Sequence, residues 1–193
     1  MKIEVLAPEK YVKQSWRNGG GTAHEIARMP LDGNAFDARV SVADIVVSGP
    51  FSTYAGYDRW LLMLDGHVSL SLGGRGQSID LIAPDAAPMR FDGATAIDCE
   101  LRSPNARALN VIARRGKLNT TLVVADTRKL AGPGHWVVVA LRGSARVSAA
   151  DAASADHGDP QEVVPLSSAR IDVGEGEAAT VDATAACVAL VRF

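Results

Sequence analysis

The amino-acid sequence predicts an all-β protein whose short strands form a barrel or a sandwich. Apolar and polar residues alternate in several short segments, and glycine-rich turns separate these segments. Long stretches with an apolar residue at every third or fourth position, which would indicate helices, are missing. Only residues 106–113 also fit a short helix. The fold class therefore follows from the two-residue period and the turns.

The alternating segments predict the strands of the first half in order. Residues 36–42 carry Phe, Ala and two Val at even positions with polar residues between them, as in a strand with one buried face. Residues 67–72 show the same alternation, and the glycine-rich residues 73–76 predict a hairpin loop after them. Residues 97–102 and 109–114 complete the series.

A weak internal repeat predicts two similar halves. Trp60 opens an apolar run that ends in a glycine turn and an alternating strand, and Trp136 opens a similar one at a nearly constant offset. Residues 79–83 are matched with residues 169–173, and the Ala-, Asp- and Ser-rich residues 148–160 are interpreted as the loop that separates the matched parts. Two β-barrel-like halves are expected, covering residues 1–115 and 116–193.

Composition excludes several classes of function. The 193 residues include 20 Lys and Arg against 22 Asp and Glu, so a formal net charge of −2 gives no case for nucleic acid or an anionic membrane. No apolar run approaches the ~18 residues of a membrane helix, and Met1 to Leu6 lack the apolar stretch of a signal peptide. Cys99 and Cys187 lack a C-x-x-C spacing. A cytoplasmic location is expected.

The segment from Trp16 to Thr22 contains three consecutive glycines, Gly19, Gly20 and Gly21, after an indole. One interpretation is a tight turn held by a buried Trp, since Asn-Gly is common in turns. The other is a pocket wall whose N–H groups face a ligand. Neither a phosphate loop nor the G-x-G-x-x-G spacing is present, because His24 stands where the last glycine is needed.

Asp58 and Arg59 precede the most apolar strand, where an unpaired charge is costly, so a partner for Arg59 is expected. Asp44 or a bound carboxylate would serve. Arginine binds carboxylates through two parallel hydrogen bonds, so Arg59 either selects an acidic metabolite or forms an internal brace with an Asp. Tyr57 and Trp16 are either pocket walls or core residues.

The sequence gives little support for a metal site or for a catalytic nucleophile. Histidines 24, 67, 135 and 157 show no ligand-like spacing, so no metal or other cofactor is expected. Cys99 shares a strand face with Ile97 and Leu101, which indicates a buried, inert thiol. A G-x-S-x-G serine motif is absent.

A series of motifs in a fixed order lies mainly in the first half of the chain, at residues 16–26, 41–44, 49–52, 56–59, 91–93, 98–99, 109–111 and Arg114. Together these motifs resemble the HutD/Ves family, strongly over residues 1 to 115 and in outline beyond. Ala23 and His24 stand where Thr and Arg are common in that family. The resemblance implies a bicupin-like fold and an association with bacterial histidine utilisation, without a defined chemical activity.

Combining the motifs with the polar residues predicts a binding site in the first half. Its candidate residues are Trp16, Asn18, Gly19, Gly20, Gly21, Thr22, Glu25, Ser41, Asp44, Tyr57, Asp58, Arg59, Phe91 and Asn110. The expected function is a metal-free sensor or governor of histidine breakdown that binds a small acidic metabolite, with N-formylglutamate as the first candidate. The alternatives are a cofactor-free isomerase or hydrolase that uses Asp44 or Glu25 as general base, and a protein-interaction module. Homodimerisation is left open.

Overall fold

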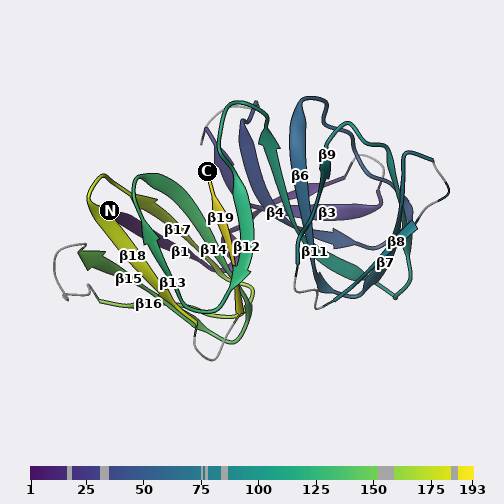
Figure 1. The fold of residues 1–193 in the computed structure, drawn as a ribbon. Helices are drawn as coiled ribbons and strands as arrows, with labels where there is room; N and C mark the ends of the chain where they lie inside the picture. Colours follow the sequence, from purple (N-terminus) through teal and green to yellow (C-terminus); the bar gives the residue numbers. More distant parts are fainter. Residues whose placement is uncertain are drawn as a thin grey trace. The chain divides into compact units, whose positions relative to one another are not determined.

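The computed structural model consists of β-strands and their connections, as the sequence predicts (Figure 1). It describes residues 1–16, 19–30, 35–74, 76, 78–83, 87–151, 159–183 and 187–193. Within these residues, the 3-10 turn η1 (Pro8–Lys10) is the only helical element. Residues 106–113, which also fitted a helix, lie in a strand.

One unit of the fold comprises Met1–Tyr11 and Asn119–Phe193. A five-stranded antiparallel sheet has the order β1-β17-β14-β19-β12, and a four-stranded sheet has the order β13-β18-β15-β16. The strands are β1 (Lys2–Leu6), β12 (Thr121–Ala125), β13 (Arg128–Ala131), β14 (Gly134–Arg142), β15 (Ala145–Asp151), β16 (Gln161–Val163), β17 (Ser168–Val173), β18 (Glu177–Asp182) and β19 (Cys187–Arg192). Val138 and Ile171 from one sheet and Val147 and Val181 from the other are fully buried in one core, so the two sheets pack face to face.

The other unit comprises Val12–Leu118. Its six-stranded sheet has the order β2-β3-β4-β11-β6-β9, and its four-stranded sheet has the order β5-β10-β7-β8. The strands are β2 (Val12–Ser15), β3 (Gly21–Met29), β4 (Ala38–Ile45), β5 (Gly49–Pro50), β6 (Tyr57–Asp65), β7 (His67–Leu72), β8 (Ser78–Ile82), β9 (Met89–Asp92), β10 (Ile97–Leu101) and β11 (Ala106–Arg114). Met63 and Ala108 from the larger sheet pack with Leu70 and Ile97 from the smaller one.

The strand order confirms the predicted repeat. The order β4-β11-β6-β9 in one unit matches β12-β19-β14-β17 in the other, and β5-β10-β7-β8 matches β13-β18-β15-β16. Trp60 on β6 and Trp136 on β14 therefore lie in equivalent strands, and positive φ angles at Gly66 and Gly143 form the turns that follow. No sheet in the described residues closes into a barrel, so each half is a pair of facing sheets.

Two details of the predicted repeat are wrong. Residues 169–173 lie in β17, which matches β9, whereas residues 79–82 lie in β8. The equivalent of β8 is the three-residue strand β16, whose short polar sequence shows little alternation. The expected loop at residues 148–160 begins later than predicted, because β15 continues to Asp151. The part of that prediction that concerns residues 152–158 lies outside the described residues.

The division into units differs from the expected ranges at the N-terminus. β1 pairs with β17 at five positions, from Lys2 opposite Asp172 to Leu6 opposite Ser168. The Tyr11 hydroxyl also donates to the Leu166 carbonyl oxygen. The first eleven residues thus belong with residues 119–193, while the later break, after Leu118, lies close to the expected boundary after residue 115.

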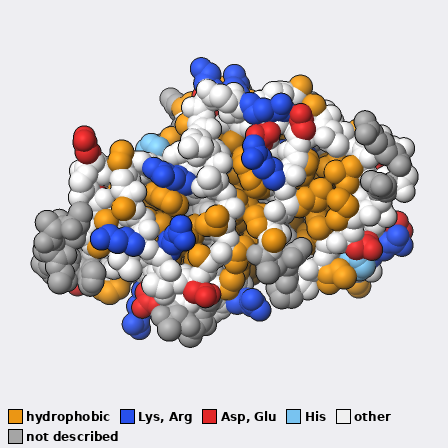
Figure 2. Space-filling view, in the orientation of Figure 1, with side chains coloured by type: hydrophobic (Ala, Val, Ile, Leu, Met, Phe, Trp, Pro, Cys, Tyr) orange, Lys and Arg blue, Asp and Glu red, His pale blue; other side chains and the backbone are white. Residues whose placement is uncertain are grey.

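The face shown in Figure 2 carries basic and acidic side chains interspersed with apolar ones, in keeping with the small net charge. Within the described residues, no helix has the length and apolar character needed to cross a membrane.

Candidate functional site

A cavity of about 450 Å³ lies within the unit of residues 12–118. Strands β2 to β6, strand β11 and the segment after β5 contribute its walls. Ile45 and Leu61 line it and also belong to the core between the two sheets, so the cavity opens from the inner face of the six-stranded sheet. Its aromatic walls are Trp16, Phe51 and Tyr54, and its charged side chains are Arg39 and Arg59.

Strand register brings the polar side chains of the cavity together. Ser41 on β4 lies opposite Asn110 on the central strand β11. In an adjacent row, Ile112 of β11 lies opposite both Arg39 and Arg59. Because neighbouring strands are about 4.8 Å apart, the two arginine backbones flank β11 at a separation of roughly 10 Å. Two cations therefore enter one cavity from either side of the same strand.

Arg59 is a buried cation without a carboxylate partner in the described residues. It is only 6% exposed. Its Nη1 donates to the Ser52 carbonyl oxygen at 2.9 Å, its Nη2 donates to Asn110 Oδ1 at 3.2 Å, and its Nε has no hydrogen-bond partner. The rings of Phe51, Tyr54 and Phe91 lie 5.1–5.7 Å from its guanidinium carbon. Burial lowers the pKa of Arg59 to about 10, so the group remains charged at neutral pH.

Arg39 is a second cation of the cavity, and sequence reasoning missed it. Its Nη2 donates to the Tyr54 hydroxyl at 3.1 Å, and its guanidinium lies 4.8 Å from the Phe36 ring centre. Arg39 Nε and Ser41 Oγ are buried without a hydrogen-bond partner in the described chain. Together with Arg59 Nε, the cavity residues hold three unused polar atoms, two of them cationic donors. Such a set suits an anionic group with further acceptor atoms.

Four of the candidate residues line the cavity, namely Trp16, Ser41, Arg59 and Asn110. Phe91 is a core residue whose ring faces Arg59 from outside the lining. Tyr57 lies further along β6, where its hydroxyl donates to the Phe36 carbonyl oxygen at 2.8 Å.

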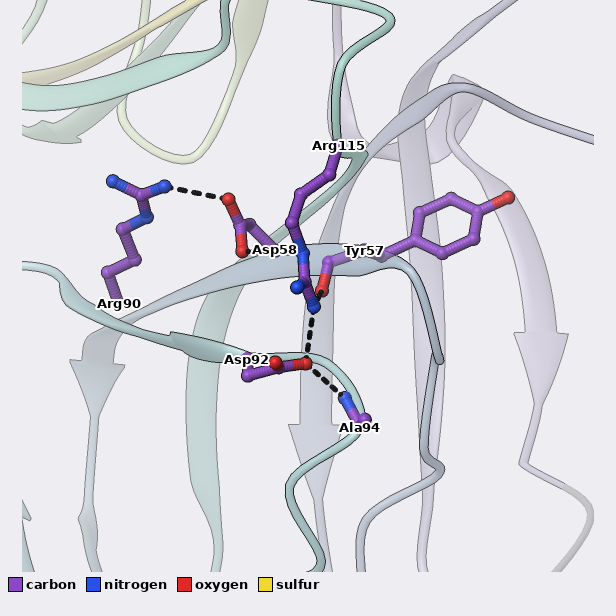
Figure 3. A network of polar contacts seen from close by, with 6 residues as sticks. All are labelled: Tyr57, Asp58, Arg90, Asp92, Ala94 and Arg115. Atoms are coloured by element: carbon purple, nitrogen blue, oxygen red, sulfur yellow. Dashed lines mark hydrogen bonds and ion pairs between the residues drawn. The ribbon is translucent and has the colours of Figure 1, made fainter.

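Asp58 does not line the cavity, because neighbouring strand residues point to opposite faces. Its carboxylate pairs with Arg90 at 2.7 Å and with Arg115 at 3.3 Å (Figure 3). Arg115 also binds Asp92, the residue that accepts a hydrogen bond from the Ala94 amide.

Of the two partners expected for Arg59, Asp44 or a bound carboxylate, the structure excludes Asp44. Asp44 alternates with the cavity residues Ala43 and Ile45 and so points to the opposite face of β4. There it accepts a hydrogen bond from Arg107 Nε at 2.8 Å and pairs with His24 Nε2 at 2.8 Å. Burial raises the pKa of Asp44, but the hydrogen bonds from Arg107 and His24 outweigh this effect and hold it below the usual value.

Replacing Asp44 by Asn should give a pH-dependent loss of stability. Because the native pKa lies below the unfolded one, the ionised carboxylate stabilises the fold above the usual Asp value of about 3.9, and this contribution disappears as the pH falls through the native pKa. Denaturant unfolding at a series of pH values should show Asp44→Asn less stable than wild type at pH 7, with a difference that shrinks on acidification. Asp98→Asn, at an exposed position of β10, is the control. A difference that stays constant between pH 7 and pH 3 would contradict the expectation.

Gly19 and Gly20 form the turn between β2 and β3, and Gly21 is the first residue of β3. Trp16 N donates to the Gly21 carbonyl oxygen at 2.9 Å, and Gly19 N donates to the Trp16 carbonyl oxygen at 3.0 Å. A Cβ atom on Gly21 would lie 2.2 Å from the Asp44 carbonyl oxygen and 3.1 Å from the Trp16 ring. None of Gly19, Gly20, Gly21 and Thr22 lines the cavity. The segment thus positions Trp16, whereas Asn18 lies outside the described residues.

The cavity lining contains no carboxylate, histidine, cysteine or lysine among the described residues. Glu25 lies outside it, with both carboxylate oxygens bound by Arg28 at 2.7 and 2.8 Å. The described residues also contain no group of three or more His, Cys, Asp or Glu that could hold a metal ion. Burial raises the pKa of the Cys99 thiol to about 11. The polar side chains that the described lining offers are those of Gln14, the serines at 15 and 52, Arg39, Ser41, Thr53, Tyr54, Arg59 and Asn110.

Comparison with known protein families shows to which family this chain belongs. The HutD family model matches residues 8–189. The chain belongs to the HutD family. Two curated relatives are similar to it: the Pseudomonas putida "Uncharacterized 21.2 kDa protein in hutC 3'region", 36% identical over 112 residues, and Protein Ves of Citrobacter koseri, 30% identical over 125 residues. These matches span 58% and 64% of each chain respectively, so they cover less than two thirds of the relatives' lengths.

Solved structures confirm the predicted bicupin-like fold. HutD from Pseudomonas fluorescens SBW25 superposes with a TM-score of 0.83 at 24% identity, covering 99% of this chain and 98% of that one. A Cupin 2 conserved barrel domain protein from Leptotrichia buccalis gives 0.56 at 13% identity, covering 88% and 86%. Of the neighbouring residues Ala23 and His24 on β3, Ala23 lines the cavity, while His24 pairs with Asp44 on the other face.

Proposed function

We propose that this HutD-family protein binds a small acidic metabolite in the cavity of residues 12–118 and acts as a sensor or governor of histidine breakdown. The observation that carries the proposal is Arg59, a buried guanidinium with an unused Nε and no carboxylate partner in the described residues. Leaving such a charge without a counter-ion costs free energy, and a bound carboxylate would supply the missing partner.

The other cavity residues support a ligand with more than one polar group. Arg39 supplies a second cation, and Ser41 and Asn110 supply a hydroxyl and an amide in a neighbouring row. Trp16 and Tyr54 offer apolar surface for a short carbon chain. N-Formylglutamate, with two carboxylates, a formamide and a short aliphatic spacer, matches this set and is the first candidate.

The positions of the two candidate general bases favour a sensor over an enzyme, because both bases lie away from the cavity. Asp44 and Glu25 are both held by arginines outside the lining. The ligand should therefore be recovered chemically unchanged after incubation with the protein, and nuclear magnetic resonance of the mixture distinguishes this result from turnover.

A thermal-shift screen over the intermediates of histidine degradation tests the proposal. A ligand at 100 times its Kd stabilises the native state by about 2.7 kcal/mol, which raises the Tm by roughly 5 °C or more for a chain of this size. N-Formyl-L-glutamate should produce this shift, and N-formyl-L-glutamine, which lacks one carboxylate, should produce a smaller one. Equal shifts with both compounds, or none with any intermediate, would overturn the proposal.

A further inference from the structure

We propose that ligand occupancy of the cavity is transmitted through residues 51–57 to residues 114–118, where the unit of residues 12–118 ends and the chain continues into Asn119. This inference rests on the proposed function and assigns the output of the sensor. Residues 51–54 line the cavity, and residues 56 and 57 bind Arg114 and Arg115. One short segment thus contacts both the candidate ligand site and the connection between the two units.

Both cations of the cavity hold this segment. Arg59 Nη1 donates to the Ser52 carbonyl oxygen at 2.9 Å, and Arg39 Nη2 donates to the Tyr54 hydroxyl at 3.1 Å. The Arg59 guanidinium also lies 5.5 Å from the Tyr54 ring centre. A carboxylate that binds the unused Nε donors of these guanidinium groups draws both groups toward itself and so displaces them from the Ser52 carbonyl and the Tyr54 hydroxyl. Ligand binding therefore changes the contacts that fix residues 52 and 54.

The far end of the segment holds the start of the connection. Arg115 N donates to the Gly56 carbonyl oxygen at 3.0 Å, and Arg115 Nη2 donates to the Tyr57 carbonyl oxygen at 3.2 Å. Arg114 Nη2 donates to the Tyr57 hydroxyl at 2.8 Å. Figure 3 shows the Arg115 side chain reaching across the start of β6, between Asp58 and Asp92. A shift of residues 56 and 57 therefore alters the hydrogen bonds that position Arg114 and Arg115.

The turn after β9 joins the two ends of the segment by a second set of contacts. Tyr54 N donates to the Gly93 carbonyl oxygen at 2.6 Å, and Gly93 N donates to the Tyr57 carbonyl oxygen at 2.8 Å. A Cβ on Gly93 would lie 2.5 Å from the Tyr54 carbonyl oxygen, so this approach requires glycine. Asp92 of the same turn binds Arg115. Tyr54, Gly93 and Asp92 thus form a continuous path to Arg115.

The ion pairs that hold the Arg115 side chain are weak enough for a ligand to alter. Its partners Asp58 and Asp92 are 19% and 49% exposed at their side chains, and Arg115 itself is 46% exposed. Exposed ion pairs contribute little to stability because water screens them. A ligand that changes the contacts of residues 52 and 54 can therefore change the fraction of molecules in which the contacts of residues 114–118 are formed.

Hydrogen exchange of the full chain, read by mass spectrometry with and without saturating N-formyl-L-glutamate, tests the proposal. The Arg115 amide, bonded to Gly56, should change its exchange rate by about five-fold or more when the probe binds. Since binding couplings are reciprocal, Arg115→Gln should change the affinity for the probe by a similar factor. Arg102→Gln, which breaks a surface pair with Glu100 in the same unit, is the matched control and should change neither quantity.

The outcomes separate the two proposals. If calorimetry shows that the probe binds while exchange at residues 114–118 is unchanged, the transmission is overturned and the binding function stands. If the probe does not bind, the assignment of N-formylglutamate as the ligand is overturned. The transmission is then tested by hydrogen exchange of variants without ligand. In that case Arg59→Met should change exchange at residues 51–57 and at Arg115 together. Should Arg59→Met not fold, Arg115→Gln must alter exchange at residues 51–57, and an unchanged rate there overturns the proposal.

Discussion

Replacing Arg59 by Met should weaken binding of the acidic ligand strongly while leaving the protein folded. Removing one partner of a buried, hydrogen-bonded charge pair typically costs about 2 kcal/mol or more of binding free energy, which is roughly a 30-fold loss of affinity. The fold should tolerate the change, because Arg59 has no carboxylate partner in the described residues and the variant loses a desolvated charge. Titration calorimetry with N-formyl-L-glutamate, with circular dichroism as the check on folding, measures both effects.

Two further variants sharpen the Arg59 test. Arg59→Lys keeps the charge but lacks the planar pair of donors, so its affinity should lie between those of wild type and Arg59→Met. Arg102→Met removes an arginine from the exposed pair with Glu100 and should leave the affinity unchanged. A folded Arg59→Met protein that binds the ligand with unaltered affinity would make Arg59 a structural residue and would place the site elsewhere.

The strands could be predicted from sequence because each depends on a local two-residue period. That period is legible at residues 97–101, where polar side chains face water and apolar ones face the core. It is less clear in β11, whose residues 108–113 are all buried, so periodicity alone did not exclude a helix there. The three-residue strand β16 is too short to show a period, and the repeat was therefore misaligned around it.

The site was only partly predictable, since a period shows which residues share a face but not what that face meets. Arg39 occupies a polar position of an alternating strand, where the two-residue period predicts a side chain that faces solvent. In the structure the apolar neighbour Val40 is fully buried and Ser41 is 1% exposed, so both faces of β4 are covered. The apolar residues around Arg59 in the sequence indicated that it needs a partner. Excluding Asp44 as that partner required knowing on which face of β4 its side chain lies.

The triple-glycine segment shows how a motif of the HutD family can be structural and still serve the site. Gly21 allows β3 to approach the Asp44 carbonyl oxygen, and it leaves room for the Trp16 ring, which lines the cavity. The segment therefore affects binding through the position of Trp16. Its own described glycines contribute no cavity wall.

Replacing Gly21 by Ala should be among the most destabilising single changes in this unit. The new Cβ would lie 2.2 Å from the Asp44 carbonyl oxygen and 3.1 Å from two atoms of the Trp16 ring, and a backbone atom in a strand ladder cannot move aside without breaking pairing. Overpacking of this kind costs about 3 kcal/mol. Urea unfolding should show this loss, and calorimetry should show weaker binding of N-formyl-L-glutamate, because Trp16 is displaced from the cavity wall.

Gly19→Ala is the matched control within the same glycine segment. A Cβ at Gly19 meets nothing within 4 Å, so the substitution carries only the strain of a φ of +71°. A left-handed conformation costs a non-glycine residue about 1 kcal/mol, and Trp16 keeps its place, so binding should be retained. If Gly19→Ala and Gly21→Ala lowered stability equally and both kept full affinity, close packing at Gly21 would not be the reason for the glycine, and the segment would no longer be needed to position Trp16.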